Sequence, residues 1–230
     1  MSADGAWATP RVLSVVVDTP GWFDRHAEEL VEALRADGDD ATLVRKQDDV
    51  REGEAAFYLS CMRITPPAVL ARNKHNFVAH ASDLPKDRGF SPIVWQILEG
   101  VNDIPVCLIE ARDPVDSGEI YRRDVLHFQG HELNTELRER LGKLIIEMCL
   151  SVMRSPEPPA GRQQVGEPTW RKRRRAADSR LDPNQTIAAQ FPLLRVVDND
   201  AYPAFFDLNG RRYILRIEDG GPAPAPEAKP

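Results

Sequence analysis

Short apolar runs rich in β-branched residues recur along the first 110 positions of the chain. Runs of this length, when glycine, proline or polar clusters bound them, are typical of buried β-strands. Five of them predict strands: RVLSVVV (11–17), ATLVR (41–45), AAFYLSC (55–61), NFVAH (76–80) and IPVCLIE (104–110).

Helical periodicity fills most of the gaps between these runs. Ala27, Leu30, Val31 and Leu34 share one helical face, and Gly38 follows as a stop. Three further helices are predicted: a short one opened by Pro66-Pro67, one over 93–99 behind Ser91-Pro92, and a long one from about His131 to Met153. Alternating strands and helices predict an α/β fold with a doubly wound, mostly parallel sheet. No strand is followed by GxGxxG or a P-loop pattern, which disfavours a bound dinucleotide or a P-loop triphosphate.

The composition changes at Ser155, where SPEPPAGRQQVGEP (155–168) has the proline and glycine content of a linker. The basic run WRKRRR (170–175) follows, and Asn209-Gly210 between apolar runs predicts a β-hairpin. We therefore expect three parts: the main α/β domain over 1–154, a linker with a small α+β appendage over 155–219, and a disordered tail over 220–230.

The formal net charge is −6 and the isoelectric point is near 5.5. This balance disfavours a general nucleic-acid binder, although the basic run at 170–175 keeps RNA binding as an alternative. The widely spaced Cys61, Cys107 and Cys149 predict buried free thiols rather than a disulfide or a metal site. No apolar stretch approaches the roughly 20 residues that cross a bilayer, so we expect a cytoplasmic protein with neither membrane contact nor bound metal.

A histidine and an aspartate each follow a predicted strand. His80 lies in NFVAHASDLPKDRG (76–89) and Asp116 in DPVDSGEIY (113–121). The intervening loop, helix and strand would bring both to the carboxyl edge of the sheet, where open α/β sheets bind ligands. Each residue alone is explained more simply, as a structural histidine and a turn-capping aspartate. Together they predict an imidazole–carboxylate pair suited to acid–base chemistry.

The pattern around this pair resembles the folate-dependent formyltransferases. This family includes methionyl-tRNA formyltransferases, glycinamide ribonucleotide transformylases and sugar-nucleotide N-formyltransferases. The similarity implies a Rossmann-like formyltransferase domain that binds N10-formyltetrahydrofolate as a cosubstrate. It is carried by H-x-S-x-L-P-x-x-x-G and V-D-x-G-x-I, here His80, Ser82, Leu84, Pro85, Gly89, Val115, Asp116, Gly118 and Ile120.

The resemblance also implies site residues. The family's catalytic trio is an asparagine, a histidine and an aspartate, and His80 and Asp116 match the last two. The place of the asparagine, two residues before the histidine, holds Val78. Asn76 is our candidate for the third member, because side chains on one strand face recur every second residue. The implied pterin contacts are backbone groups around Lys86, Gly89, Phe90, Ile104 and Val106.

The segment LLRVVDNDAYPAFF (193–206) resembles a stretch found after the linker in formyltransferases that act on tRNA or sugar nucleotides. It implies that Arg195 meets a pyrophosphate and that Tyr202 stacks on a base or sugar. We expect a formyltransferase acting on the primary amine of a nucleotide-linked amino sugar, such as a dTDP-4-amino-4,6-dideoxyhexose, with no nucleic-acid partner. The alternatives are another small amine or aminoacyl acceptor, and a non-catalytic folate or nucleotide-sugar binding protein. The oligomeric state stays open, with a homodimer as one option.

Overall fold

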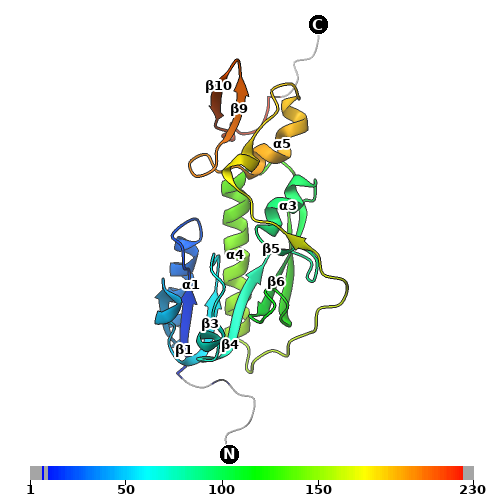
Figure 1. The fold of residues 1–230 in the computed structure, drawn as a ribbon. Helices are drawn as coiled ribbons and strands as arrows, with labels where there is room; N and C mark the ends of the chain where they lie inside the picture. The colour runs from blue at the N-terminus through cyan, green and yellow to red at the C-terminus, as the bar shows by residue number, and fades with distance from the viewer. Residues whose placement is uncertain (1–6, 8–9, 225–230) are drawn as a thin grey trace, which may run out of the picture.

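The computed structural model describes residues 7 and 10–224. At its centre lies a six-stranded sheet with the order β2-β1-β3-β4-β6-β7 (Figure 1). Strands β1 to β4 are parallel, whereas β6 runs antiparallel to β4 and β7 antiparallel to β6. The expected mostly parallel sheet is therefore confirmed. Its strands are β1 (Val12–Val16), β2 (Asp40–Val44), β3 (Gly53–Tyr58), β4 (Asn73–His80), β6 (Asp103–Glu110) and β7 (Ile120–His127).

Both faces of the sheet are covered, which explains why the strands appear as continuous apolar runs. Successive residues point to opposite faces, so that Val15 joins the larger core beside α1 and α4 while Val16 joins a smaller one beside α2. The larger core also holds Phe57, Phe77 and Leu108, which are fully buried. The helices are α1 (Asp24–Ala36), η1 (Gln47–Asp49), α2 (Pro67–Leu70), α3 (Pro92–Leu98) and α4 (Asn134–Met153).

Strand β7 is an element that the sequence pattern does not predict. It lies at the edge of the sheet, paired with β6 along its length and bridged to Arg162 at Ile120. In its sequence IYRRDVLH, Leu126 is the single buried residue. An edge strand with one solvated face carries too few apolar residues to show in a hydropathy pattern.

After α4 the chain returns along the outside of the sheet and crosses the molecule beside β5, as Figure 1 shows. There β8 (Trp170–Arg171) pairs in parallel with β5 (Arg88–Gly89). The hairpin predicted at Asn209-Gly210 is confirmed as an antiparallel pair. The division into parts at residue 154 stays a prediction, and 225–230 of the predicted tail lie outside the described residues. The remaining elements are η2 (Ala176–Ser179), α5 (Ile187–Val196), β9 (Ala204–Leu208) and β10 (Arg211–Leu215).

Candidate active site

His80 is the last residue of β4 and lies at the carboxyl edge of the parallel strands. The residue is 6% exposed, and its Nε2 lies 2.8 Å from the carbonyl oxygen of Asp87. Because a carbonyl oxygen can only accept a hydrogen bond, Nε2 carries the hydrogen in this contact. Nδ1 is therefore the ring nitrogen that remains for chemistry.

Asp116 lies in the loop between β6 and β7, beside the imidazole. Its Oδ1 is 3.6 Å from Nδ1 of His80, and the two side chains are 7% and 6% exposed. Its Oδ2 accepts the backbone N–H of Gly89 at 2.8 Å. The structure thus brings together the two residues that the sequence places 36 positions apart, and one carboxylate oxygen stays directed at the imidazole.

Gly89 links this pair to the segment that crosses the site. Its φ of +97° lies in the left-handed region, and a Cβ at this position would sit 2.6 Å from the carbonyl oxygen of Arg171. Any side chain would therefore push β8 away from β5. Next to it, Phe90 is 39% exposed and lies below the guanidinium of Arg173, while Lys86 is exposed and its carbonyl accepts the Ser82 hydroxyl at 2.7 Å.

Ile104 and Val106 face the core with their side chains and pair with β7 through their backbone. Both side chains are fully buried in the larger core. In the antiparallel register the last residue of β4, His80, lies opposite Cys107. Residues 104–106 therefore extend beyond the end of β4, with β7 pairing on one side only. At this edge Pro105, which has no N–H, can offer a ligand its carbonyl oxygen.

Asn76 lies in the middle of β4, within a buried polar cluster. Its Nδ2 donates to the carbonyl of Leu70 at 3.0 Å, and its Oδ1 accepts the Tyr58 hydroxyl at 3.4 Å. Burial raises the pKa of Tyr58, which keeps the hydroxyl as a donor. At about 3.3 Å per residue, the Cα atoms of Asn76 and His80 lie roughly 13 Å apart along the strand. The structure places Asn76 on the expected face but away from the pair, and Val78 stands between them.

Arg195 is placed differently from the role that the sequence suggests for it. The residue is 3% exposed, and its guanidinium donates to Asn102 Oδ1 at 2.8 Å and to the carbonyl and carboxylate of Glu132 at 3.1 and 3.4 Å. These contacts tie α5 to the loops before β6 and α4. A pyrophosphate would have to displace them. Tyr202 is 49% exposed, in the loop before β9.

The basic run at 170–175 is only partly a solvated surface. Arg171 pairs with Asp87 and Glu99, and Arg174 is half-buried with its guanidinium over the ring of Trp95. Burial lowers the pKa of Arg174. A continuous basic face of the kind that RNA requires is thus reduced to three exposed side chains: Lys172, Arg173 and Arg175.

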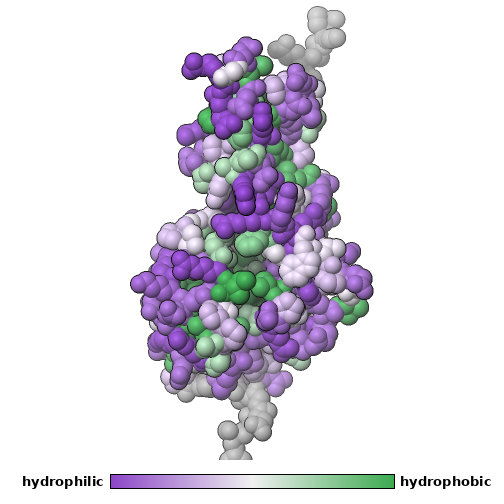
Figure 2. All heavy atoms as spheres, in the orientation of Figure 1, coloured by the Kyte–Doolittle hydropathy of each residue, from purple (hydrophilic) through white to green (hydrophobic). Residues whose placement is uncertain are grey.

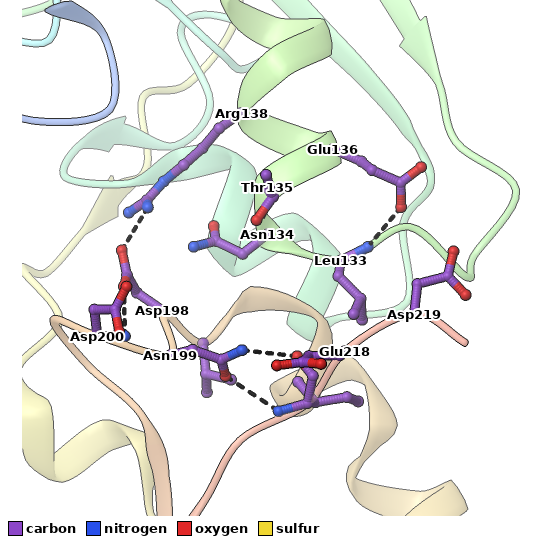
Figure 3. Close-up of a pocket in the computed structure, with 12 residues that line it drawn as sticks. Leu133, Asn134, Thr135, Glu136, Arg138, Asp198, Asn199, Asp200, Glu218 and Asp219 are labelled. Atoms are coloured by element: carbon purple, nitrogen blue, oxygen red, sulfur yellow. Dashed lines mark hydrogen bonds and ion pairs between the residues drawn. The ribbon is translucent and has the colours of Figure 1, made fainter. Parts of the chain in front are cut away.

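The surface around the site is hollowed. Figure 2 shows an apolar area in a hollow near the middle of the molecule, and comparison with Figure 1 puts it close to the end of β4. A separate pocket of about 550 Å³ lies between the start of α4 and the appendage (Figure 3). There Arg138 pairs with Asp198, and Asn199 exchanges two hydrogen bonds with the backbone of Ile217. These contacts hold the appendage against α4.

No group of His, Cys, Asp or Glu side chains within the described ranges is arranged to hold a metal ion. Within the same ranges, no helix is both long and apolar enough to cross a bilayer. All three cysteines are free; Cys107 and Cys149 are buried, and Cys61 is half-buried, with burial raising its pKa to about 12. Such a thiol is a poor nucleophile, so none of these groups competes with the imidazole–carboxylate pair.

A sequence profile of formyl transferases matches residues 20–153, more than half of the chain. The chain belongs to the formyl transferase family. The match includes both His80 and Asp116, and it confirms the resemblance drawn from the motifs around them.

Curated relatives agree with this assignment. The methionyl-tRNA formyltransferase of Anaeromyxobacter sp. (strain K) is 28% identical over 208 residues, which are 81% of this chain and 65% of that protein. The methionyl-tRNA formyltransferase of Mycoplasma capricolum is 24% identical over 175 residues, 74% of this chain and 55% of that protein. The chain therefore spans about half to two thirds of the length of these relatives.

Solved structures share the fold. Methionyl-tRNA formyltransferase from Clostridium thermocellum superposes with a TM-score of 0.77 at 20% identity, over 91% of this chain and 95% of that one. A likely sugar N-formyltransferase from Mycobacterium tuberculosis gives 0.73 at 20% identity, over 93% and 100%. HypX from Aquifex aeolicus in complex with tetrahydrofolic acid gives 0.71 at 13% identity, over 91% and 38%.

Proposed function

We propose that this chain transfers a formyl group from N10-formyltetrahydrofolate to a primary amine. The observation that carries this proposal is the approach of His80 Nδ1 and Asp116 Oδ1 to 3.6 Å at the carboxyl edge of the sheet. Membership of the formyl transferase family supports the reaction type. The fold shared with a tetrahydrofolate-bound protein supports the cosubstrate.

In the reaction that we propose, an amine attacks the formyl carbon and negative charge develops on the formyl oxygen. His80 stabilises this oxygen through Nδ1–H of the protonated ring, since Nε2–H is held by the carbonyl of Asp87. A donor of this kind is typically worth about 2.7–4 kcal/mol of transition-state stabilisation. Asp116 stabilises the imidazolium and accepts the amine proton, directly or through water. The tetrahedral intermediate then collapses: the bond between the formyl carbon and N10 breaks, and N10 takes up a proton and leaves as tetrahydrofolate.

The cosubstrate would be held largely by backbone groups. Residues 86–90 and 104–106 flank the imidazole–carboxylate pair. The N–H groups of 86–90 are bonded within the protein and Pro105 has none, so this backbone can offer carbonyl oxygens to the N–H donors of a pterin. Phe90, partly exposed beside Gly89, would contribute an apolar wall. The tetrahydrofolate ring would then lie against the start of β6, with its formyl group toward His80.

For the acceptor, we propose the amino group of a nucleotide-linked amino sugar. A likely sugar N-formyltransferase from Mycobacterium tuberculosis and a sugar N-formyltransferase from Shewanella share the fold over 100% and 99% of their own chains. The exposed Tyr202 is a candidate for stacking on the base or the sugar. Arg195 has no place in this proposal, because its guanidinium is buried against Glu132 and Asn102.

The test is formyl transfer to a panel of nucleotide-linked amino sugars, followed by mass spectrometry for the formylated product. His80→Asn and Asp116→Asn should each lower kcat by about 10²–10³-fold or more while tetrahydrofolate still binds. His127→Asn is the matched control, because His127 forms an exposed pair with Asp103 at 2.8 Å. A wild-type protein that formylates no amine, or a His80→Asn variant that retains full turnover, would overturn the proposal.

A further inference from the structure

The segment of residues 161–171, here called the strap, contains the second half of the predicted linker and passes over the site. It bonds to both loops that carry the imidazole–carboxylate pair: Thr169 and Arg171 hold the loop after β4, and Gln164 holds the loop after β6. We propose that the strap positions His80 and Asp116 for formyl transfer, with Arg171 and Gln164 as its positioning residues. This inference rests on the proposed function.

One arm of the strap acts on His80 through Asp87. Nε of Arg171 donates to Asp87 Oδ1 at 2.6 Å, and the backbone N–H of Asp87 donates to the Thr169 hydroxyl at 2.8 Å. Arg171 is itself fixed by two further bonds, at 2.6 and 2.7 Å, to the carboxylate of Glu99. Asp87, held in this way, accepts Nε2–H of His80 on its carbonyl oxygen at 2.8 Å.

The other arm acts on the turn that carries Asp116. Nε2 of Gln164 donates to the carbonyl oxygens of Asp116 and Gly118, both at 2.8 Å. Its Oε1 accepts a hydrogen bond at 2.6 Å from the guanidinium of Arg88, which precedes Gly89 in β5. One amide side chain therefore connects the turn of Asp116 to the strand whose N–H holds the Asp116 carboxylate.

Backbone conformation shows why these loops need support. Asp87 and Asp116 are both non-glycine residues in the left-handed region, with φ of +57° and +59°. Such residues are uncommon and persist where surrounding contacts over-determine them. Each of the two is held by a different strap side chain, and each presents the group that meets His80.

The contacts imply a specific consequence for the imidazole. With the Asp87 carbonyl in place, the hydrogen of a neutral His80 resides on Nε2 and Nδ1 faces Asp116. Without Arg171 that carbonyl is free to move, and the ring can rotate or adopt the other tautomer. KM separates this role from a binding role, because Arg171 and Gln164 contact the protein's own loops and act on the reaction through them.

The experiment compares Arg171→Ala and Gln164→Ala with Arg154→Ala in the full chain. Arg154 forms a comparable two-bond ion pair with Asp37 at the far end of α4, so it controls for loss of a surface guanidinium. We expect kcat to fall about 10- to 100-fold in both strap variants, with KM for both substrates within about twofold of wild type. Arg171→Lys, which can still reach Asp87, should recover part of kcat.

A second readout does not depend on turnover. ¹⁵N NMR of histidine-labelled protein, at a pH where the imidazole is neutral, should show the Nε2–H tautomer of His80 in the wild type and a mixture in Arg171→Ala. An unchanged tautomer together with unchanged kcat would overturn the inference, as would an equal loss of kcat in Arg154→Ala. If the wild type formylates nothing, the proposed function fails while the tautomer measurement still decides whether the strap orients His80.

Discussion

Replacing Arg195 with alanine should destabilise the fold rather than weaken acceptor binding. Its guanidinium contacts Glu132 and Asn102, and the side chains of the Arg195–Glu132 pair are each 4% exposed. Burial acts to raise the pKa of Glu132, but hydrogen bonds from the backbone N–H groups of Gln129 and Gly130 outweigh it and lower the pKa. Glu132 is therefore a carboxylate at neutral pH, and removing Arg195 would leave it with one buried partner fewer.

The size of the effect follows from what Glu132 retains. Removing one partner of a buried ion pair typically costs about 3–5 kcal/mol. Glu132 keeps the N–H groups of Gln129 and Gly130 at 2.7 and 3.0 Å, and Arg140 at 3.3 Å. We therefore expect the lower end, about 3 kcal/mol. In a chain of this size each kcal/mol lowers Tm by roughly 2–4 °C, which predicts a loss of about 6–12 °C.

The assay is thermal and urea unfolding followed by circular dichroism, with acceptor KM measured at a temperature where the variant is folded. Arg140→Ala is the matched control, because Arg140 reaches the same carboxylate from a side chain that is 40% exposed. Because Arg140 itself is solvated, we expect its loss to cost less than the loss of Arg195, about 1 kcal/mol. An unchanged Tm for Arg195→Ala together with a raised acceptor KM would refute the reasoning and return Arg195 to the binding site.

Gly142→Ala should destabilise the protein by about 1–3 kcal/mol, because a Cβ would lie 2.3 Å from Cδ2 of the buried His26. The better helix propensity of alanine offsets up to about 1 kcal/mol of this loss. Thermal unfolding checks this, and His26→Ala in the same chain should recover the loss. Burial raises the pKa of Glu110 in the folded protein. The folded state then holds this proton more tightly than the unfolded chain, so the free energy of unfolding should fall as pH rises from the ordinary pKa of a glutamate through the raised one. Glu110→Gln should remove this dependence in urea titrations between about pH 4 and 8, and an identical slope in both proteins would contradict it. Val78→Asn should raise kcat by about tenfold or more by adding a second oxyanion donor, at a stability cost of about 1–3 kcal/mol; unchanged turnover in a folded variant would show that position 78 does not reach the formyl oxygen.

The strands that the sequence predicts are those buried on both faces. In β1, Leu13 to Val16 are all buried, so the run is apolar at every position except Ser14. The hydropathy pattern does not predict strand β7, because only Leu126 in it is buried. Hydropathy thus predicts the layers of the sheet, and it misses the edge where water replaces the second layer.

The candidate site divides in a similar way. His80 and Asp116 can be found from sequence because each lies in a short motif next to a predicted strand end. Arg171 cannot be found in this way, since its contact with Asp87 spans 84 positions and depends on the route of the linker. In the sequence, a linker rich in proline and glycine carries no sign of the surface that it crosses. From the sequence, the basic run around Arg171 leaves RNA binding as an alternative, whereas in the structure Arg171 contacts the loop that follows His80.

The valine at position 78 explains why the contacts that hold His80 in place matter. Asn76, held by Tyr58 and Leu70, lies roughly 13 Å along the strand from His80, so His80 is left as the single side chain of the proposed trio that can donate to the formyl oxygen. With two donors, a small rotation of one is partly compensated by the other. With one, the whole stabilisation of about 2.7–4 kcal/mol depends on a single N–H direction. A chain that relies on one imidazole gains most from fixing that imidazole, and the bond from His80 to the Asp87 carbonyl, itself held by Arg171, provides this constraint.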